Sequence, residues 1–148
     1  MNIVQLHNLT DEQVGDILIL MNELDDTVAV TESMLRAAVS EPSTIFFAAV
    51  DGGRIVGCAS LCVTRHPLGL KGMVEDVVVS SECRGRGIGR LLMEHIVDFA
   101  QGLAPIELCL TSRPSRVSAN KLYRAIGFQP YQTNVYKLMA RTATPTDK

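Results

Sequence analysis

The chain has 148 residues, of which 47% are apolar and 20% charged, with a mean hydropathy of +0.17 and a formal net charge of −2. This composition is typical of one soluble domain that is large enough to bury a core. No run approaches 18 uncharged apolar residues and no basic, apolar leader opens the chain, so we expect a cytoplasmic protein without a membrane span.

The first half of the sequence predicts three strands and two helices. Thr10 and Gln13 have the spacing of a capping box, so a helix begins there, and Pro42 ends the second helix. Residues 51–53 (Asp-Gly-Gly) are a hairpin signal between two β-rich runs. The predicted elements are a strand at 2–6, a helix from residue 10, a helix at 31–40, and strands at 43–50 and 54–63.

The second half predicts strands that alternate with helices. After a loop at 66–69, an apolar strand at 73–79 leads through residues 84–90, here called the Gly/Arg segment, into a helix with apolar residues at a period of 3.6. The remaining predicted elements are a strand at 106–110, a helix at 119–126 that Gly127 ends, and a last strand at 134–139. This order indicates a mixed α/β fold, antiparallel in its first half and with crossover helices in its second.

The segment between the strand at 73–79 and the next helix predicts a phosphate site. Glycines at this position let consecutive backbone N–H groups point at one place, and a helix N-terminus adds free donors and partial positive charge. Three arginines within seven residues (Arg84, Arg86 and Arg90) add attraction for phosphate groups. We therefore expect a ligand that carries a diphosphate.

Two common phosphate motifs do not match this segment. A P-loop requires Lys and Ser or Thr after its last glycine, but Gly89 is followed by Arg90 and Leu91. A dinucleotide fingerprint read from Gly85 places Arg90 where the third glycine belongs.

Two motifs resemble the GCN5-related N-acetyltransferase (GNAT) family. Residues 84–89 (Arg-Gly-Arg-Gly-Ile-Gly) match its R-x-x-G-x-G pyrophosphate loop, and residues 118–128 resemble its second motif, N-x-x-(L)Y-x-x-x-GF. The resemblance implies an α/β (α+β) fold with a mixed, mostly antiparallel sheet of about six to seven strands and about four helices, splayed around the strand before the loop. The predicted elements form a single domain over residues 1–140, followed by a polar tail at 141–148. The oligomeric state stays open, and a homodimer is one alternative, because many members of the family form dimers.

The same resemblance implies acetyl-CoA as the co-substrate and a primary amine of a small molecule as the acceptor. The strand before the loop would hold the pantetheine arm and the thioester carbonyl, and the loop would hold the diphosphate. The implied cofactor-binding residues are Val77, Val78, Val79, Arg84, Gly85, Arg86, Gly87, Ile88, Gly89, Arg90 and Asn120.

Tyr123 is the candidate acid for the departing CoA thiolate. It lies three residues after Asn120 on one predicted helix, and a phenol with an ordinary pKa of about 10 is protonated at neutral pH. The alternative is a packing role, because Ala119, Leu122 and Ile126 form an apolar stripe with it.

Glu75 is the candidate base, acting through a water molecule. Strict strand alternation places it on the same face as Val77 and Val79, and Asp76 on the opposite face. The alternative is that either carboxylate only pairs with a neighbouring arginine.

Charge and local similarity leave other functions open. Residues 1–51 hold nine acids and one base, a formal charge of −8, whereas residues 52–148 carry +6. The basic part fits a phosphate ligand. The resemblance implies that the helices of the acidic part border the entrance for the acceptor, where negative charge would favour a cationic amine. Residues 74–80 and 82–85 are also similar to glucosamine-phosphate N-acetyltransferases. A non-catalytic acetyl-CoA-binding regulatory module is a further alternative.

Cysteines and aromatic residues exclude other classes of site. Cys58, Cys62, Cys83 and Cys109 have neither C-x-x-C spacing nor a nearby histidine at zinc-ligand spacing, which predicts free thiols and no metal. Seven aromatic residues without a stacking array, at a pI near 5.9, argue against nucleic-acid binding.

Overall fold

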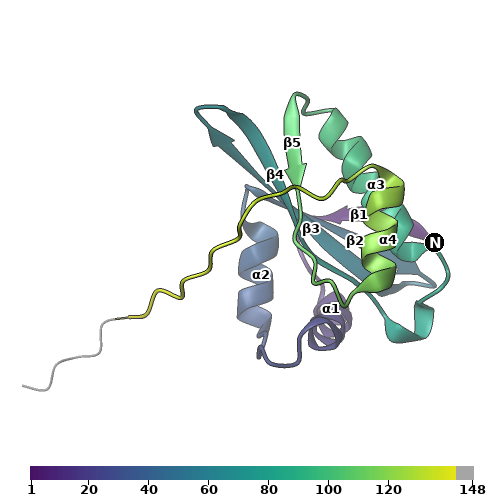
Figure 1. Cartoon of the computed structure of the whole chain (residues 1–148). Coiled ribbons are helices and arrows are strands. Elements are labelled where there is room, and N and C mark those ends of the chain that lie inside the picture. The colour runs from purple at the N-terminus through teal and green to yellow at the C-terminus, as the bar shows by residue number, and fades with distance from the viewer. Residues whose placement is uncertain (143–148) are drawn as a thin grey trace, which may run out of the picture.

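The computed structural model describes residues 1–142, whose strands form a five-stranded sheet in the order β1-β2-β3-β4-β5 (Figure 1). The strands are β1 (Asn2–Leu6), β2 (Thr44–Asp51), β3 (Arg54–His66), β4 (Gly69–Val79) and β5 (Ile106–Cys109). The helices are α1 (Asp11–Leu24), α2 (Glu32–Ser40), α3 (Ile88–Gln101) and α4 (Val117–Ile126), and the 3-10 helix η1 (Ser81–Cys83) precedes α3.

Strands β1 to β4 pair antiparallel, whereas β5 runs parallel to β4 after the crossover through α3. This confirms the expected mixed, mostly antiparallel sheet with four helices. The predicted hairpin between β2 and β3 is also confirmed, because Asp51 pairs with Arg54 and both turn glycines have positive φ (57° at Gly52 and 81° at Gly53). This geometry matches a two-residue turn to the twist of its strands.

Two strand predictions differ from the structure. The sheet has five strands and not six or seven, because residues 134–139, predicted as the last strand, are exposed and without regular structure. A strand needs a neighbour for its backbone groups, and within residues 1–142 this segment has none. The hairpin between β3 and β4 is tighter than predicted, because both strands extend to leave a turn of only residues 67–68. Most of the tail predicted at 141–148 lies outside the described residues.

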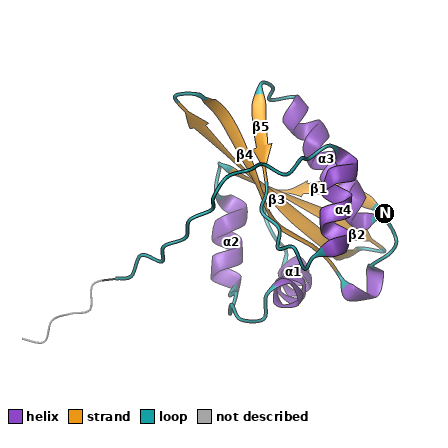
Figure 2. Cartoon of the chain, in the orientation of Figure 1, coloured by secondary structure: helices purple, strands orange, loops and turns teal. Residues whose placement is uncertain are grey.

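Helices α1 and α2 cover one face of the sheet, and α3 and α4 cover the other (Figure 2). An apolar core lies under each pair of helices. The core under α1 and α2 includes Ile17, Leu20, Leu35, Phe46, Cys58 and Val78. The core under α3 and α4 includes Phe47, Leu61, Val74, Leu92, Met93 and Ile96. Because both faces are covered, the central strands β2 and β3 read as nearly continuous apolar runs.

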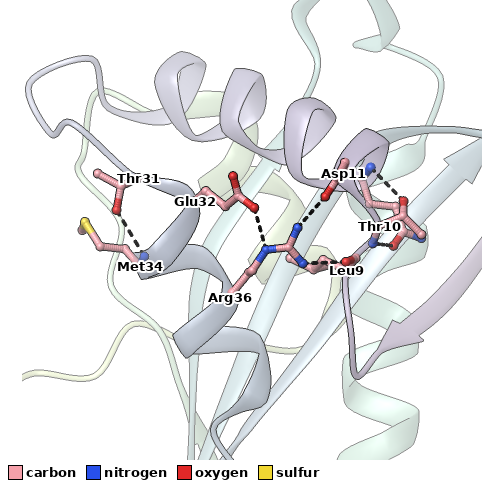
Figure 3. Close-up of polar contacts among 8 residues, drawn as sticks. Leu9, Thr10, Asp11, Thr31, Glu32, Met34 and Arg36 are labelled. Atoms are coloured by element: carbon pink, nitrogen blue, oxygen red, sulfur yellow. Dashed lines mark hydrogen bonds and ion pairs between the residues drawn. The ribbon is translucent and has the colours of Figure 1, made fainter.

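Side-chain caps define the starts of α1 and α2 (Figure 3). The backbone N–H of Gln13 donates to Thr10 Oγ1 over 3.2 Å, and the backbone N–H of Thr10 donates to Gln13 Oε1 over 3.0 Å. The predicted capping box is therefore confirmed. Thr31 caps α2 in the same way by accepting from the backbone N–H of Met34.

Arg36 joins the two N-terminal helices. Its guanidinium donates to Glu32 one turn earlier on α2, to the backbone carbonyl of Leu9 and to Asp11 of α1, at 2.7–2.8 Å (Figure 3). It is the single basic residue among the first 51, and its position fixes α2 against the start of α1.

Asp16 joins α1 to strand β3 of the sheet. Its carboxylate is buried, accepts hydrogen bonds from the Arg54 guanidinium, and accepts the backbone N–H of Ile55 over 2.9 Å. The hydrogen bond from Arg54 holds the pKa of Asp16 below its usual value despite the burial.

Candidate active site

Strand β4 contains a β-bulge at Asp76. Ser60 of β3 pairs with Glu75, but Cys58 pairs with Val78, so β4 carries one residue more than β3 over this stretch. Asp76 has a φ of 55°, a left-handed conformation that Asp and Asn tolerate better than other residues with a side chain. One extra residue shifts the alternation of sides by one position.

The bulge changes which residues of β4 face each core. Val74, before it, belongs to the core under α3 and α4, and after it Val77 and Val79 pack against that same core. Val78 instead enters the core under α1 and α2. Glu75 therefore lies on the α1/α2 face. The expectation that it shares a face with Val77 and Val79 is wrong, because strict alternation takes no account of the extra residue.

Strands β4 and β5 separate at the level of this bulge. They pair in parallel from Leu70 with Ile106 to Met73 with Cys109, and within residues 1–142 the pairing ends there. Residues 74–79 consequently have β3 along one edge and an open edge on the other. The predicted splay around the strand before the loop is confirmed.

Backbone groups of β4 point into this opening. The N–H of Ser80 donates to the carbonyl of Val56 over 2.9 Å. This bond identifies which positions of the antiparallel ladder between β3 and β4 are hydrogen-bonded pairs. Because bonded positions alternate, Val78 bonds to β3, whereas Val77 and Val79 on either side of it direct their N–H and C=O groups to the open edge.

The Gly/Arg segment turns the chain from β4 into α3. Gly85 and Gly87 have φ values of 77° and 78°, and Gly87 is the N-cap of α3 without any side chain to cap the helix. The first N–H groups of α3 are therefore free to bind a ligand. Ile88 is buried, so it offers only its backbone. At Gly89 a Cβ would make only ordinary contacts, so packing within the chain does not explain this glycine.

Each arginine of this segment has a carboxylate partner, and each guanidinium remains half exposed or more. The pairs are Arg84 with Glu23 (3.9 Å), Arg86 with Asp51 (2.8 Å) and Arg90 with Glu94 (2.7 Å). The bond to Arg86 holds the pKa of Asp51 below its usual value. Two of these acids come from the acidic first 51 residues, so the two charged parts of the sequence partly neutralise each other.

Tyr123 and Asn120 lie on α4, which covers the face of the sheet that carries Val77 and Val79. Tyr123 is buried in the α3/α4 core against Phe128, with ring centroids 6.3 Å apart, and burial raises the pKa of its phenol. Its hydroxyl forms no hydrogen bond within residues 1–142, yet it is not among the fully enclosed polar atoms. The Asn120 amide donates to the carbonyl of Arg113 over 2.9 Å.

Glu75 and Asp76 form a pair of neighbouring carboxylates on the other face. Desolvation by burial raises the pKa of both groups, and the negative charge of Asp76 raises the pKa of Glu75 further. The same charge also contributes to the raised pKa of the buried Cys58 thiol, after burial itself. Neither carboxylate has an ion-pair partner among the described residues, so the arginine pairing considered as an alternative is not formed.

Two residues near the opening were not expected from the sequence. Ser112, between β5 and α4, has a fully enclosed hydroxyl without a hydrogen-bond partner in the described chain. A buried hydroxyl left unpaired is costly, and nothing among the described residues accounts for it. Glu23, at the end of α1, contacts the segment before α3. A lone serine in a loop and a glutamate at a helix end carry no signal in a single sequence.

The acetyltransferase (GNAT) domain family matches residues 42–130, which contain the bulge, the opening and the Gly/Arg segment. The chain therefore belongs to the GNAT family.

Individual relatives agree with this assignment. N-acetyltransferase family 8 member 2 of Rattus norvegicus is 34% identical over 106 residues, which are 70% of this chain and 45% of that protein. Glucosamine 6-phosphate N-acetyltransferase 1 of Oryza sativa subsp. japonica is 30% identical over 64% of each chain. The chain thus spans between about half and two thirds of the length of these relatives. The crystal structure of glucosamine-6-phosphate N-acetyltransferase from Arabidopsis thaliana has a TM-score of 0.74 at 20% identity, covering 94% of this chain and 98% of that one, and so shares the fold.

No helix within residues 1–142 has both the length and the apolar character needed to cross a membrane. The same residues contain no group of three or more His, Cys, Asp or Glu side chains placed to hold a metal ion.

Proposed function

We propose that this protein is an acetyl-CoA-dependent N-acetyltransferase that acetylates a primary amine of a small molecule by direct attack. One observation carries the proposal: where β4 and β5 separate, the Tyr123 phenol lies in the core on one face of the sheet, and Glu75 and Asp76 lie on the other face. An acceptor and a leaving thiol can therefore approach one carbonyl from opposite sides.

The residues at the opening fit coenzyme A. The free backbone groups of Val77 and Val79 suit the amides of a pantetheine arm, and Asn120, whose amide N–H donates to the carbonyl of Arg113, keeps its side-chain oxygen as an acceptor. The N–H groups of residues 85–90, with the half-exposed arginines, suit a diphosphate. Val78 is the exception among the expected binding residues, because its side chain lies in the α1/α2 core and its backbone bonds to β3.

The chemistry requires a proton acceptor, an oxyanion donor and a proton donor. Glu75, with Asp76 beside it, attracts an ammonium group and removes its proton through a water molecule. A backbone N–H at the open edge of β4 faces the developing oxyanion, an interaction worth about 3 kcal/mol in other enzymes. Tyr123 then protonates the thiolate, and its raised pKa keeps it in the acid form at neutral pH.

An amino-sugar phosphate is the second candidate acceptor. The observation that favours it is the 30% identity to the glucosamine 6-phosphate N-acetyltransferase of rice. Against it, Glu75 and Asp76 would repel a phosphate at the α1/α2 face.

A thiol-release assay with acetyl-CoA over a panel of amines tests the proposal, with calorimetric binding of acetyl-CoA measured in parallel. Turnover on unphosphorylated cationic amines supports it, whereas turnover confined to glucosamine 6-phosphate selects the second candidate. Binding without turnover on any amine, peptide or amino sugar indicates a non-catalytic acetyl-CoA-binding module. Absence of binding overturns the assignment of the cofactor.

A further inference from the structure

Three sulfur-containing side chains lie in one row across the sheet. Cys62 of β3 pairs with Met73 of β4, and Met73 pairs with Cys109 of β5. Val74, the residue after Met73, belongs to the core under α3 and α4, so Met73 faces the α1/α2 side of the sheet. Side chains that are paired across neighbouring strands share a face. All three residues, here called the sulfur row, therefore face the α1/α2 side.

The sulfur row is partly open to solvent. Helix α1 packs on β3 and β4, and α2 packs on β2, but the ends of β3 and β4 at their hairpin extend past both helices (Figure 1). Met73 is 37% exposed, and Cys62 and Cys109 are half-buried. Methionine is polarizable and adapts its shape, and it is common on surfaces that bind varied apolar ligands. An apolar ligand would therefore gain contacts on this row.

Charged residues bound the sulfur row at both ends. Glu75 lies two residues after Met73 on β4 and before the bulge, so the two side chains share a face about 7 Å apart along the strand. Two residues before Met73, Lys71 pairs with Glu107, and both are exposed. The distance along β4 from Glu75 to Lys71 is about 13 Å. The apolar stretch between them thus has room for one ring and not for a long alkyl chain.

We propose that the acceptor is an arylalkylamine, whose ammonium group lies at Glu75 and whose aromatic ring lies on the sulfur row over Met73. This inference rests on the proposed function, in which Glu75 takes the proton of the amine. The nitrogen then bonds to the acetyl carbon, the thioester C–S bond breaks, and the thiolate takes the proton of Tyr123. A thioether sulfur contacts an aromatic ring favourably at about 5 Å. A two-carbon linker between nitrogen and ring matches the spacing of Glu75 and Met73.

The sulfur row also disfavours sugar acceptors. Thiol and thioether sulfur atoms are weak hydrogen-bond partners, so the hydroxyl groups of an amino sugar would lose water on this surface without full replacement. Lys71 and Glu107, the strong polar groups next to the row, stand opposite each other at its far end from Glu75. An arylalkylamine gives up only the water around its ring, which favours binding.

The first test compares 2-phenylethylamine with 2-methoxyethylamine in the thiol-release assay. Both are primary amines with a two-carbon linker, and only the first carries a ring. We expect kcat/KM to be at least about tenfold higher for 2-phenylethylamine. Met73→Ser removes most of the apolar contact, so it should raise the KM for 2-phenylethylamine about tenfold and change the KM for 2-methoxyethylamine or acetyl-CoA less than about twofold. Turnover without a preference for the ring, or a preference that Met73→Ser leaves intact, overturns the proposal.

Two variants control for the substitution itself. Met73→Leu keeps an apolar side chain of similar volume and should retain the preference for 2-phenylethylamine. Met139→Ser, at a 69% exposed methionine after α4, makes the same change outside the row and should leave the kinetic constants unchanged. An equal rise of KM in Met139→Ser contradicts a specific role for Met73.

The second test does not depend on turnover. Alkylation of each cysteine by iodoacetamide is followed by mass spectrometry, with and without saturating 2-phenylethylamine. A ring over the row should slow the labelling of Cys62 and Cys109 at least about threefold, because it covers both thiols, and should leave Cys83 on η1 unaffected. Labelling of the row that the amine does not slow, or slows no more than labelling of Cys83, overturns the placement of the ring.

Together the two tests separate this inference from the proposed function. Protection of Cys62 and Cys109 without turnover on any amine would support the arylalkylamine site and contradict acetyl transfer. Turnover on amines with neither a preference for the ring nor protection of the thiols would support acetyl transfer and overturn the arylalkylamine.

Discussion

The carboxylate of Glu23 accepts a hydrogen bond of 2.8 Å from the backbone N–H of Ser81. This bond joins the end of α1, on one face of the sheet, to η1, which leads into the Gly/Arg segment. Arg84 Nη2 lies 3.9 Å from the same carboxylate. Glu23 therefore partly neutralises the positive charge that we assign to diphosphate binding.

Removing this charge should strengthen binding of coenzyme A. Glu23→Gln still accepts the Ser81 N–H but no longer attracts Arg84, so we expect a dissociation constant about two- to threefold lower at low salt. The gain should vanish at 0.5 M salt, where charges are screened. Calorimetric titration at two salt concentrations measures it. Glu12→Gln, at the far end of α1, makes the same change of charge, and an equal effect there would contradict a specific role for Glu23.

Loss of the Tyr123 hydroxyl should slow turnover without weakening binding. Tyr123→Phe keeps the ring against Phe128 and removes the proton donor, so we expect kcat to fall about 100-fold. The KM for acetyl-CoA should change less than about twofold. Steady-state kinetics separate the two parameters, with Tyr131→Phe, at an exposed tyrosine after α4, as control. An unchanged kcat would leave Tyr123 with a packing role alone.

The carboxylate pair should set the acid limb of the pH–rate profile. Burial raises the pKa of Glu75 and the charge of Asp76 raises it further, so kcat/KM should fall on acidification at a pH above the ordinary glutamate value of 4.5. Asp76→Asn removes the neighbouring charge and tolerates the left-handed backbone, which moves the limb to lower pH. A limb that stays in place in this variant would show that another group titrates.

The sequence predicted features whose cause is local. The capping box of Thr10 and Gln13, the Gly52-Gly53 turn and the Gly/Arg segment each depend on residues within a few positions of one another. The bulge at Asp76 and the opening beside β5 depend on how β4 registers with strands far away in the chain, and nothing in the residues of β4 marks them. The strand expected at 134–139 has the right local pattern, but a strand exists only when another segment pairs with it.

Asp16 should contribute to stability at all but the lowest pH. Asp16→Asn loses the charge pair with Arg54, and we expect the free energy of unfolding at pH 7 to fall by about 1–2 kcal/mol. Because the folded pKa is lowered, this contribution is present above the ordinary pKa of 3.8 and is lost as the pH falls through the folded pKa. Urea unfolding at pH 7 and below pH 4 measures both differences. Asp26→Asn, in the exposed loop after α1, should leave stability unchanged at both pH values.

Two glycine substitutions should act in opposite directions. At Gly72 a Cβ would lie 2.7 Å from Leu108 Cδ2 and 2.9 Å from Leu61 Cδ1, so Gly72→Ala should lower stability by about 1–3 kcal/mol. At Gly15, inside α1, a Cβ meets nothing within 4 Å, so Gly15→Ala should raise stability by about 0.5–1 kcal/mol. Thermal unfolding of both variants gives the signs, and a stabilised Gly72→Ala would contradict the close packing of β5 on β4.

The extra residue at Asp76 makes the length of β4 matter more than most of its side chains. A conservative substitution along the strand changes one contact, whereas a further inserted residue before Val77 would turn Val77 and Val79 out of one core and Val78 out of the other. Loss of Asp76 would leave these three side chains in their cores but would remove the bulge and separate Glu75 from its neighbouring carboxylate. Insertions and deletions are therefore far less tolerable between Glu75 and Ser80 than in the turns at either end of the hairpins.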